Sequence, residues 1–224
     1  MATAARSARA GQPAAQGRAA ARRPERPGRA LSGSFYERPV LEVARDLIGC
    51  VVEHGATSGV IVETEAYHES EPACHAFVGV TARTRTIFGP PGRAYVYLSY
   101  GIHALLNAVC DREGVGAAVL IRALEPLTGV ELMRARRNMP ASLAREQELC
   151  SGPGKLTQAL SIGLECNDDD LRTGALLIRA RPARWRQPAI THGLRVGITK
   201  AAELPWRFCA AGNSYVSRPR PRAL

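Results

Sequence analysis

The sequence predicts one α+β domain, in which strands and helices occupy separate stretches of the chain rather than alternating. The chain has 224 residues, of which 46% are hydrophobic and 22% charged. It can therefore bury a core, which excludes a disordered chain, a collagen-like repeat and a small disulfide scaffold. Apolar β-rich runs fill the middle of the chain, and helical spacing lies before and after them. No stretch approaches the roughly 18 unbroken apolar residues of a membrane span, so none is expected.

Charge divides the chain into a body and two basic ends. The formal net charge is +10, but residues 1–33 (seven Arg, one Glu) and residues 218–224 (three Arg) carry nine of these charges. Residues 1–33 almost lack large apolar side chains, so we expect a disordered basic tail with weak affinity for polyanions. A transit peptide is the alternative for this Arg-rich, acid-poor segment. The folded domain is expected over 34–217, followed by a basic C-terminal tail over 218–224.

Periodicity and turn residues place the elements in order. The apolar residues between Val40 and Leu47 follow helical spacing, and Gly49 stands where that helix should stop. The expected elements that follow are a strand at 50–53, a turn at 55–59, a strand at 60–67, a loop at 68–92, strands at 94–100, 102–110 and 117–122, a helix from the capping-box pattern Thr128–Glu131 to about Arg137, helical segments at 145–150 and after Pro153, and short strands and turns over 175–217.

Two carboxylates lie on one face of the strand at 60–67. Period-two alternation places Ile61, Glu63, Glu65 and Tyr67 on the same side, with the two glutamates about 7 Å apart. Carboxylate pairs serve glycosidases, but those pairs flank the cleaved bond from opposite sides. One working carboxylate is therefore favoured over a pair. The alternative for either glutamate is a solvated strand position.

Aromatic residues are scarce, yet four of the six tyrosines fall between Tyr67 and Tyr100. Aromatic faces interleaved with cations suit a nucleobase carried on a polyanionic backbone. Ordinary half-buried strand tyrosines are the alternative, and the one favoured for Tyr95. The same stretch holds the candidate contacts His75, Arg83, Arg85 and Arg93.

Tyr100 directly precedes Gly101, at the break between two expected strands. A bulky side chain at a tight turn points out of the sheet, where it can act as a wedge between base pairs. An exposed turn tyrosine without that role is the alternative.

Three other patterns carry less chemistry. The segment Ser151–Lys155 lacks the spacing of a phosphate-binding P-loop, although a Gly-Pro turn opening a helix, with its lysine, can still hold a phosphate. The acidic run Asp168–Asp170 lacks the alternating ligands of a calcium loop and is expected to be a solvated turn. The six cysteines are at least 16 residues apart, so we expect buried free thiols in a reducing cytoplasm and no metal site.

Six motifs together resemble one known family. In their order and spacing, the chain is similar to the alkyladenine (3-methyladenine) DNA glycosylases, as a bacterial member, over about Ser34–Ser217. The motifs are Val62–Tyr67, Phe88–Gly92, Tyr95–Tyr97, Tyr100–Gly101, Leu120–Pro126 and Leu149–Lys155.

This resemblance implies a single α+β domain with a curved antiparallel sheet, flanking helices and a protruding β-hairpin. It implies a monofunctional enzyme of base excision repair, which flips a damaged purine out of duplex DNA and hydrolyses its N-glycosidic bond without a metal, a cofactor or a covalent intermediate. The enzyme is expected to act as a cytoplasmic monomer.

The resemblance also assigns residues. Glu65 resembles the general base that activates water, and Arg122 the residue that helps to hold that water and a nearby phosphate. Tyr100 resembles the wedge, and Asn107 the residue that clashes with the 2-amino group of guanine. The base pocket is implied to include Tyr67, His75 and Tyr97, and the DNA-backbone contacts Arg83, Arg85, Arg93 and Lys155.

Two departures from the family bear on substrate range. The segment between Tyr67 and His75 is one residue shorter than in the animal enzymes, and residue 103 is His where some relatives have another aromatic residue.

Three other functions remain as alternatives. A glycosidase or nucleosidase acting on free sugars would use Glu63 and Glu65 but show little salt sensitivity. A non-catalytic DNA-damage binder would need the tyrosines but not Glu65. A bifunctional glycosylase/lyase needs an amine, and Lys155 and Lys200, the only lysines, lie outside the aromatic stretch.

Overall fold

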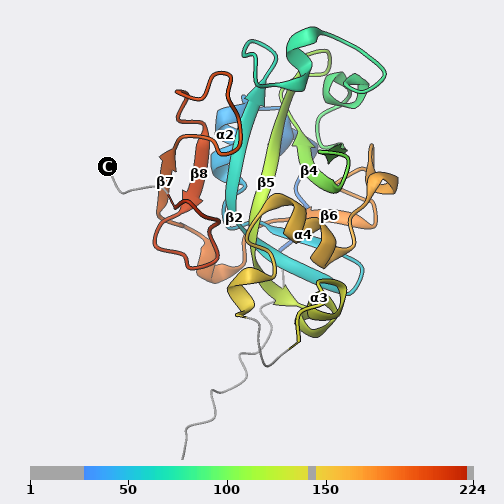
Figure 1. Ribbon diagram of the computed structural model, residues 1–224. Coiled ribbons are helices and arrows are strands. Elements are labelled where there is room, and N and C mark those ends of the chain that lie inside the picture. Colours follow the sequence, from blue (N-terminus) through green and yellow to red (C-terminus); the bar gives the residue numbers. More distant parts are fainter. Residues whose placement is uncertain (1–27, 141–144, 221–224) are drawn as a thin grey trace, which may run out of the picture.

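A computed structural model describes residues 28–140 and 145–220 and confirms the α+β class (Figure 1). Eight antiparallel strands form one sheet in the order β3-β4-β5-β2-β1-β6, while β8 also pairs with β2, and β7 pairs with β8. The strands are β1 Val51–His54, β2 Thr57–His68, β3 Ala94–Ser99, β4 His103–Val109, β5 Ala117–Thr128, β6 Leu176–Arg179, β7 Ile190–Gly193 and β8 Arg207–Ala210. The helices are α1 Gly33–Tyr36, α2 Val40–Asp46, α3 Val130–Arg136 and α4 Pro153–Leu160, with 3-10 turns η1 His75–Val78, η2 Arg85–Phe88, η3 Glu146–Glu148, η4 Leu164–Cys166 and η5 Ala183–Trp185.

The long strands β2 and β5 form the centre of the sheet. They pair from Ser58–Thr128 to His68–Ala117, with register shifts on both sides of Glu63. The opposite edge of β2 is shared, because β1 pairs with its first residues and β8 pairs with Glu63, Thr64 and Glu65. Neighbours on both edges bury this part of β2 and bring the C-terminal region next to its carboxylates.

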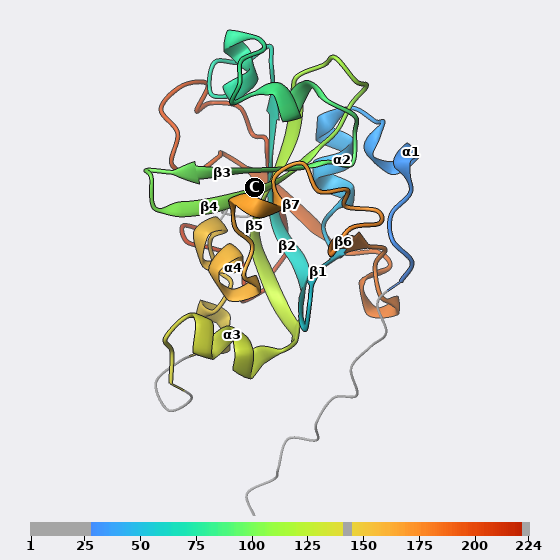
Figure 2. The same ribbon diagram turned by 90° about the vertical axis from the view of Figure 1, so that its right-hand side faces the viewer.

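Helices cover both faces of the sheet (Figure 2). On one face, α2 buries Val43 and Ala44 against β2, and the Thr64 hydroxyl donates to the Ala44 carbonyl over 2.8 Å. On the other face, α4 buries Leu156 and Leu160 beside β4 and β5. The β3–β4 hairpin extends beyond the sheet on the α4 side, which is the protruding hairpin that the resemblance implied.

The junction of β5 and α3 differs from the prediction. β5 continues past Arg122 to Thr128, so the predicted capping residue is still in the strand. The residue before α3 is Gly129, with φ of 72° and no side-chain hydrogen bond to the helix. A Cβ at Gly129 would collide with the Ala56 carbonyl, so only glycine fits this abrupt change from strand to helix. The capping-box prediction was therefore wrong.

Other boundaries moved less. The predicted turn at 55–59 is shorter because β2 begins at Thr57, and the predicted loop at 68–92 contains η1 and η2. The predicted helical segment at 145–150 is only the single turn η3.

Ordered contacts extend beyond the predicted 34–217 domain at both ends. The Leu31 amide donates to the Ile178 carbonyl over 2.9 Å, and its side chain joins the core. Near the other end, the Pro219 carbonyl accepts from Arg207. The remainder of the two predicted tails, residues 1–27 and 221–224, lies outside the described residues.

The cysteines are as predicted: all six are buried and free. Within the described part of the chain, no cluster of three or more His, Cys, Asp or Glu side chains is arranged to hold a metal ion. No helix there has the length and apolar character needed to span a membrane.

Candidate active site

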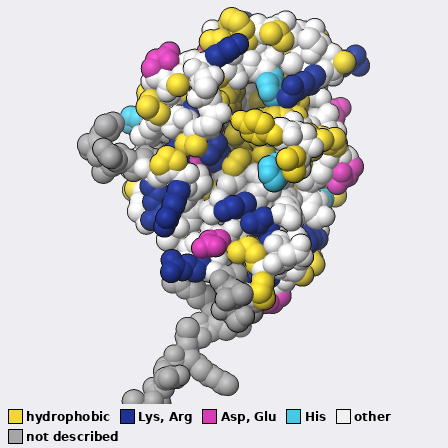
Figure 3. Space-filling view, viewed as in Figure 1, with side chains coloured by type: hydrophobic (Ala, Val, Ile, Leu, Met, Phe, Trp, Pro, Cys, Tyr) yellow, Lys and Arg dark blue, Asp and Glu magenta, His cyan; other side chains and the backbone are white. Residues whose placement is uncertain are grey.

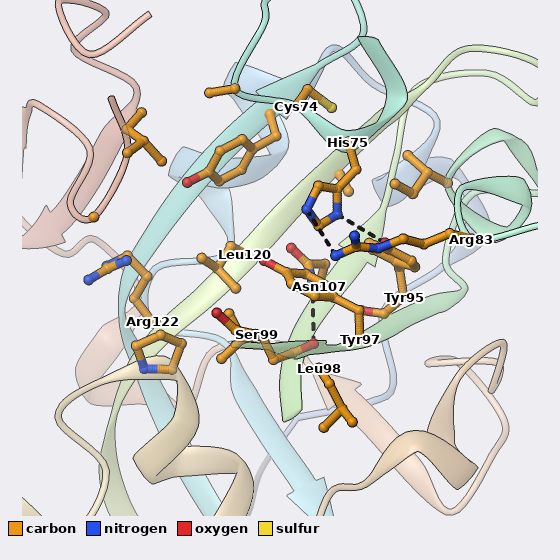
Figure 4. A pocket seen from close by; sticks show the side chains of 18 of the residues that line it. Cys74, His75, Arg83, Tyr95, Tyr97, Leu98, Ser99, Asn107, Leu120 and Arg122 are labelled. Carbon is orange, nitrogen blue, oxygen red and sulfur yellow. Dashed lines mark hydrogen bonds between the residues drawn. The ribbon is translucent and has the colours of Figure 1, made fainter. Parts of the chain in front are cut away.

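A cavity of about 480 Å³ opens between the β3–β4 hairpin, the 73–87 loop and the 196–198 loop (Figure 4). Figure 4 shows His75 and Arg83 on one side of it and Arg122 on the opposite side. The sequence assigned seven residues to catalysis, the base pocket or the wedge. Glu65 does not line the cavity, and the other six do: Tyr67, His75, Tyr97, Tyr100, Asn107 and Arg122.

Aromatic rings form one wall. Tyr95 and Tyr97 stand two residues apart on β3, so they share a face, and their rings stack with centroids 5.3 Å apart. The His75 ring meets Tyr97 edge-on, with centroids 4.5 Å apart. Tyr95 lies on a strand, as expected, but it is buried rather than half-buried, and its ring also lines the cavity.

His75 is held as a neutral side chain. Its Nδ1 lies 3.0 Å from the Tyr95 hydroxyl, and Arg83 Nη2 lies 3.3 Å from its Nε2. Because a guanidinium only donates, Nε2 must accept, and the proton is assigned to Nδ1. Burial, helped by Arg83, lowers the pKa of His75 to about 4.

Asn107 is fixed in the floor of the cavity. The β3–β4 register places it opposite Tyr95, and its amide nitrogen donates to the Tyr95 carbonyl over 3.0 Å. A second, longer bond of 3.4 Å reaches the Leu105 carbonyl. The amide therefore cannot swing aside without losing both bonds.

Glu65 lies directly behind the cavity wall. Its side chain is 0% exposed and is not part of the lining. Its Oε1 accepts from the Val196 amide over 2.7 Å, and its Oε2 accepts from the Tyr67 hydroxyl over 2.8 Å and from Arg122 over 3.2 Å. All three donors do line the cavity. Each hydrogen bond to Glu65 therefore comes from a residue that contacts the space that a ligand would fill.

The two glutamates on this strand are electrostatically different. Burial raises the pKa of Glu65, although Arg122, Val196 and Tyr67 act in the opposite direction. Burial also acts to raise the pKa of Glu63, but Arg122, Arg207 and Ser217 outweigh it and hold that pKa below its ordinary value. Glu63 is a fixed anion, and Glu65 is the carboxylate with the stronger tendency to take up a proton. The solvated alternative was wrong for both, since both are fully buried.

Tyr100 is 90% exposed at the tip of the β3–β4 hairpin. Its φ is 51°, a left-handed value that is unusual for a bulky residue, and Gly101 follows with φ of 70°. Leu98 and Ile102 are also exposed on this hairpin. The tip therefore presents apolar side chains to solvent at the mouth of an aromatic cavity.

Comparison with known proteins agrees with this geometry. Residues 34–214 match the family model described as methylpurine-DNA glycosylase. The chain belongs to this family. Members of this family hydrolyse N-glycosyl bonds in DNA and are DNA-repair enzymes. The match confirms the family that the six motifs predicted.

Curated relatives show the same similarity over nearly their whole length. A protein of Bradyrhizobium diazoefficiens is 48% identical, covering 89% of this chain and 96% of its own. One of Methanoculleus marisnigri is 50% identical, covering 84% and 98%, and one of Rubrobacter xylanophilus is 51% identical, covering 78% and 90%. Each carries the name "Putative 3-methyladenine DNA glycosylase".

The four cations predicted to contact the DNA backbone lie in different surroundings. Arg83 lines the aromatic cavity, and Lys155 lines a second cavity beside it. Arg85 is exposed on η2 and lines neither cavity, and Arg93 donates to the Asp168 carbonyl over 3.0 Å. Their roles remain predictions.

The sequence did not predict Arg195, the residue that packs against the Tyr67 ring. Arg195 forms a buried ion pair with Glu71, 2.7 Å between the nearest atoms, and its guanidinium lies 4.7 Å from the centre of the Tyr67 ring. The same guanidinium donates to the Ala201 carbonyl, which pins the loop that presents Val196 to Glu65. Partners separated by 124 residues leave no local pattern in the sequence.

Proposed function

We propose that this protein is a monofunctional DNA glycosylase that releases alkylated or otherwise damaged purines from duplex DNA. The observation that carries the proposal is Glu65, a buried carboxylate of raised pKa whose three hydrogen-bond donors all line an aromatic cavity. Family membership supports the same activity. We further propose that it acts as a cytoplasmic monomer, without a cofactor.

The cavity suits a damaged purine better than a normal one. Alkylation at a ring nitrogen makes a purine cationic, which favours stacking against the electron-rich rings of Tyr67 and Tyr97. His75 is neutral at physiological pH, so it does not repel such a base. We assign to the fixed amide of Asn107 the exclusion of the 2-amino group of normal guanine, the role that the family resemblance implies.

The chemical step uses Glu65 as a general base. A water molecule enters between Tyr67, Arg122 and Val196, loses a proton to Glu65 and forms a bond to C1′ of the sugar. The C1′–N bond breaks, and the purine leaves with the bonding electrons. The reacting sugar is oxocarbenium-like, so the nearby carboxylate also stabilises its positive charge. A positioned base of this kind contributes about 10²–10⁴-fold in rate.

The reaction ends with an intact abasic strand. Strand cleavage by a lyase needs an amine nucleophile. Lys155 and Lys200 are the only lysines of the chain, and neither lines the aromatic cavity.

Access to the base requires extrusion of the nucleotide from the helix, at a cost of a few kcal/mol. We propose that the exposed Tyr100 ring enters the gap that is left and replaces the lost stacking. Tyr100 lines the mouth of the cavity into which the nucleotide would turn.

Base release from oligonucleotides tests the proposal. Duplexes carry one 3-methyladenine-type lesion, hypoxanthine, ethenoadenine or undamaged guanine, and strand breaks are compared with and without alkali. We expect breaks at damaged purines only after alkali treatment. Breaks without alkali would contradict the monofunctional mechanism, and lesion binding without base release would identify a damage binder instead.

A further inference from the structure

A second cavity, of about 750 Å³, lies beside the aromatic one, and Arg122 lines both. Its walls come from the η3 turn, the beginning of α4 and the C-terminal segment 214–220. The C-terminal segment is far from the other two in the sequence, and Lys155 is the one residue of these three segments for which a DNA contact was predicted. Figure 3 shows Lys and Arg side chains gathered on this face of the molecule, below the apolar hollow.

The lining of this cavity is strongly cationic. Besides Arg122, it contains four cations and one carboxylate, Glu148. Among the described residues, none of the four cations forms an ion pair, whereas Arg122, Arg179 and Arg195 are all paired with glutamates. Like charges in a concave site focus the potential and attract an anion. The four cations are Arg145, Lys155, Arg218 and Arg220.

The C-terminal segment is anchored so that it holds two of these cations in place. The Ser217 amide donates to Glu63 over 2.7 Å, and Arg207 donates to the Pro219 carbonyl over 2.9 Å. Glu63 and Arg207 are themselves buried and paired at 2.8 Å. Arg218 and Arg220 leave this anchor as exposed side chains. Fixing the backbone in advance lowers the entropy lost when an anion binds.

This feature is additional to the family match, which ends at residue 214. Arg218 and Arg220 lie beyond it, yet they face the same cavity as Lys155. The anchor uses Glu63, the carboxylate for which the chemical step has no role.

We propose that Arg218 and Arg220 extend the phosphate contacts that the family resemblance implies for Arg122 and Lys155, so that this cavity binds backbone phosphates of the DNA strand next to the extruded nucleotide. The inference rests on the proposed function, because it extends the same DNA interface from the aromatic cavity across Arg122. A DNA strand that passes over both cavities would have its extruded base in the aromatic cavity and the neighbouring phosphates in the second cavity. Arg122 then contacts Glu65 on one side and the phosphate site on the other.

The salt dependence of DNA binding tests this proposal. Neutralising each phosphate contributes about 0.9 to the slope of log K against log salt concentration. The double substitution Arg218→Ala/Arg220→Ala should therefore reduce the slope by up to about 1.8, measured with undamaged and lesion-containing duplexes. Arg218→Lys/Arg220→Lys should keep most of the slope, since the charges remain.

A matched control removes the same charge elsewhere. Arg45 and Arg186 are exposed, line neither cavity and lie on α2 and directly after η5. Arg45→Ala/Arg186→Ala should leave both the slope and base release unchanged. Melting curves of both double variants should match the unsubstituted protein, because all four side chains are exposed.

Equal slopes for the two alanine variants would overturn this inference. Base release by the unsubstituted protein would in that case still support the proposed function, so the two failures are distinguishable. Inorganic phosphate, added at constant ionic strength, separates the two sources of the anion. We expect no competition with DNA at millimolar phosphate, and competition at micromolar phosphate would assign the cavity to a free phosphate ligand instead.

Discussion

Replacing Glu65 with Gln removes the proposed proton acceptor while keeping the size of the side chain. The amide oxygen can still accept from Val196, and the Tyr67 hydroxyl can rotate to accept from the new NH₂ group. Only the contact with Arg122 is lost outright. We therefore expect a folded protein that binds lesion-containing DNA and releases its base about 10²–10⁴-fold more slowly.

Single-turnover base release as a function of pH is the decisive assay. A general base accepts a proton only when it is ionised, and burial raises the pKa of Glu65, the proposed base. The rate should therefore rise with pH through that raised pKa and then level off, and this rise should be absent from Glu65→Gln. Glu63 cannot cause the same profile, because Arg122 and Arg207 hold its pKa below the ordinary value despite its burial.

Glu63→Gln is the matched comparison and should fail differently. Glu63 pairs with Arg122 and Arg207 at 2.8 Å each, and both guanidiniums are buried. Removing one partner of a buried ion pair costs about 3–5 kcal/mol. Urea unfolding should show this loss, while the residual activity keeps its pH profile. A stable Glu63→Gln without activity, beside an active Glu65→Gln, would refute the assignment of the base.

Four further expectations concern the cavity and its rim. Tyr100→Ser should slow base release from matched duplexes by ~10–100-fold, because about 1–3 kcal/mol of stacking is lost. Release from mismatched duplexes should slow less, and the melting temperature of the protein should not change. Equal losses on both substrates, with a lowered melting temperature, would show that the tyrosine is structural. Asn107→Ser should open the cavity floor and allow measurable release of undamaged guanine, which the unsubstituted protein should spare. The pKa of His75 is about 4 in the folded protein and about 6.5 in the unfolded chain. The unfolded chain therefore binds more protons between pH 4 and pH 6.5, which favours unfolding as the pH falls. The urea midpoint should fall with pH over this range, and it should fall less in His75→Gln. Base release should persist in excess chelator. Loss of activity in chelator that added metal restores would show that a metal ion takes part in the reaction.

Local patterns predicted much of the scaffold and part of the site. Alternation along β2 placed Glu63, Glu65 and Tyr67 on one face, and the structure joins all three through Arg122 and the Tyr67–Glu65 hydrogen bond. The apolar runs on either side of Tyr100 predicted the hairpin and its exposed tip. These features depend on strand periodicity and on a single turn, which neighbouring residues determine.

Features that depend on distant partners were not predictable in this way. Glu63 is buried because Arg207 and Ser217, 144 and 154 residues away, neutralise and hydrogen-bond it. The capping pattern at Thr128 was locally convincing but was overridden by the pairing of β5 with β2, which keeps Thr128 in the strand opposite Ser58. In both cases, sheet pairing brought in partners that no local window contains.

The two glutamates show how such pairing divides roles between chemically identical neighbours. Both are on β2, both are fully buried, and both contact Arg122. β8 adds a second guanidinium beside Glu63 alone, and the loop before it adds only a backbone amide beside Glu65. One carboxylate is thereby committed to holding Arg122 and the C-terminal segment, and the other keeps a raised pKa beside the cavity. In the proposed mechanism, the first glutamate anchors the phosphate site and the second is the general base, so their shared contact with Arg122 would join DNA binding to the chemical step.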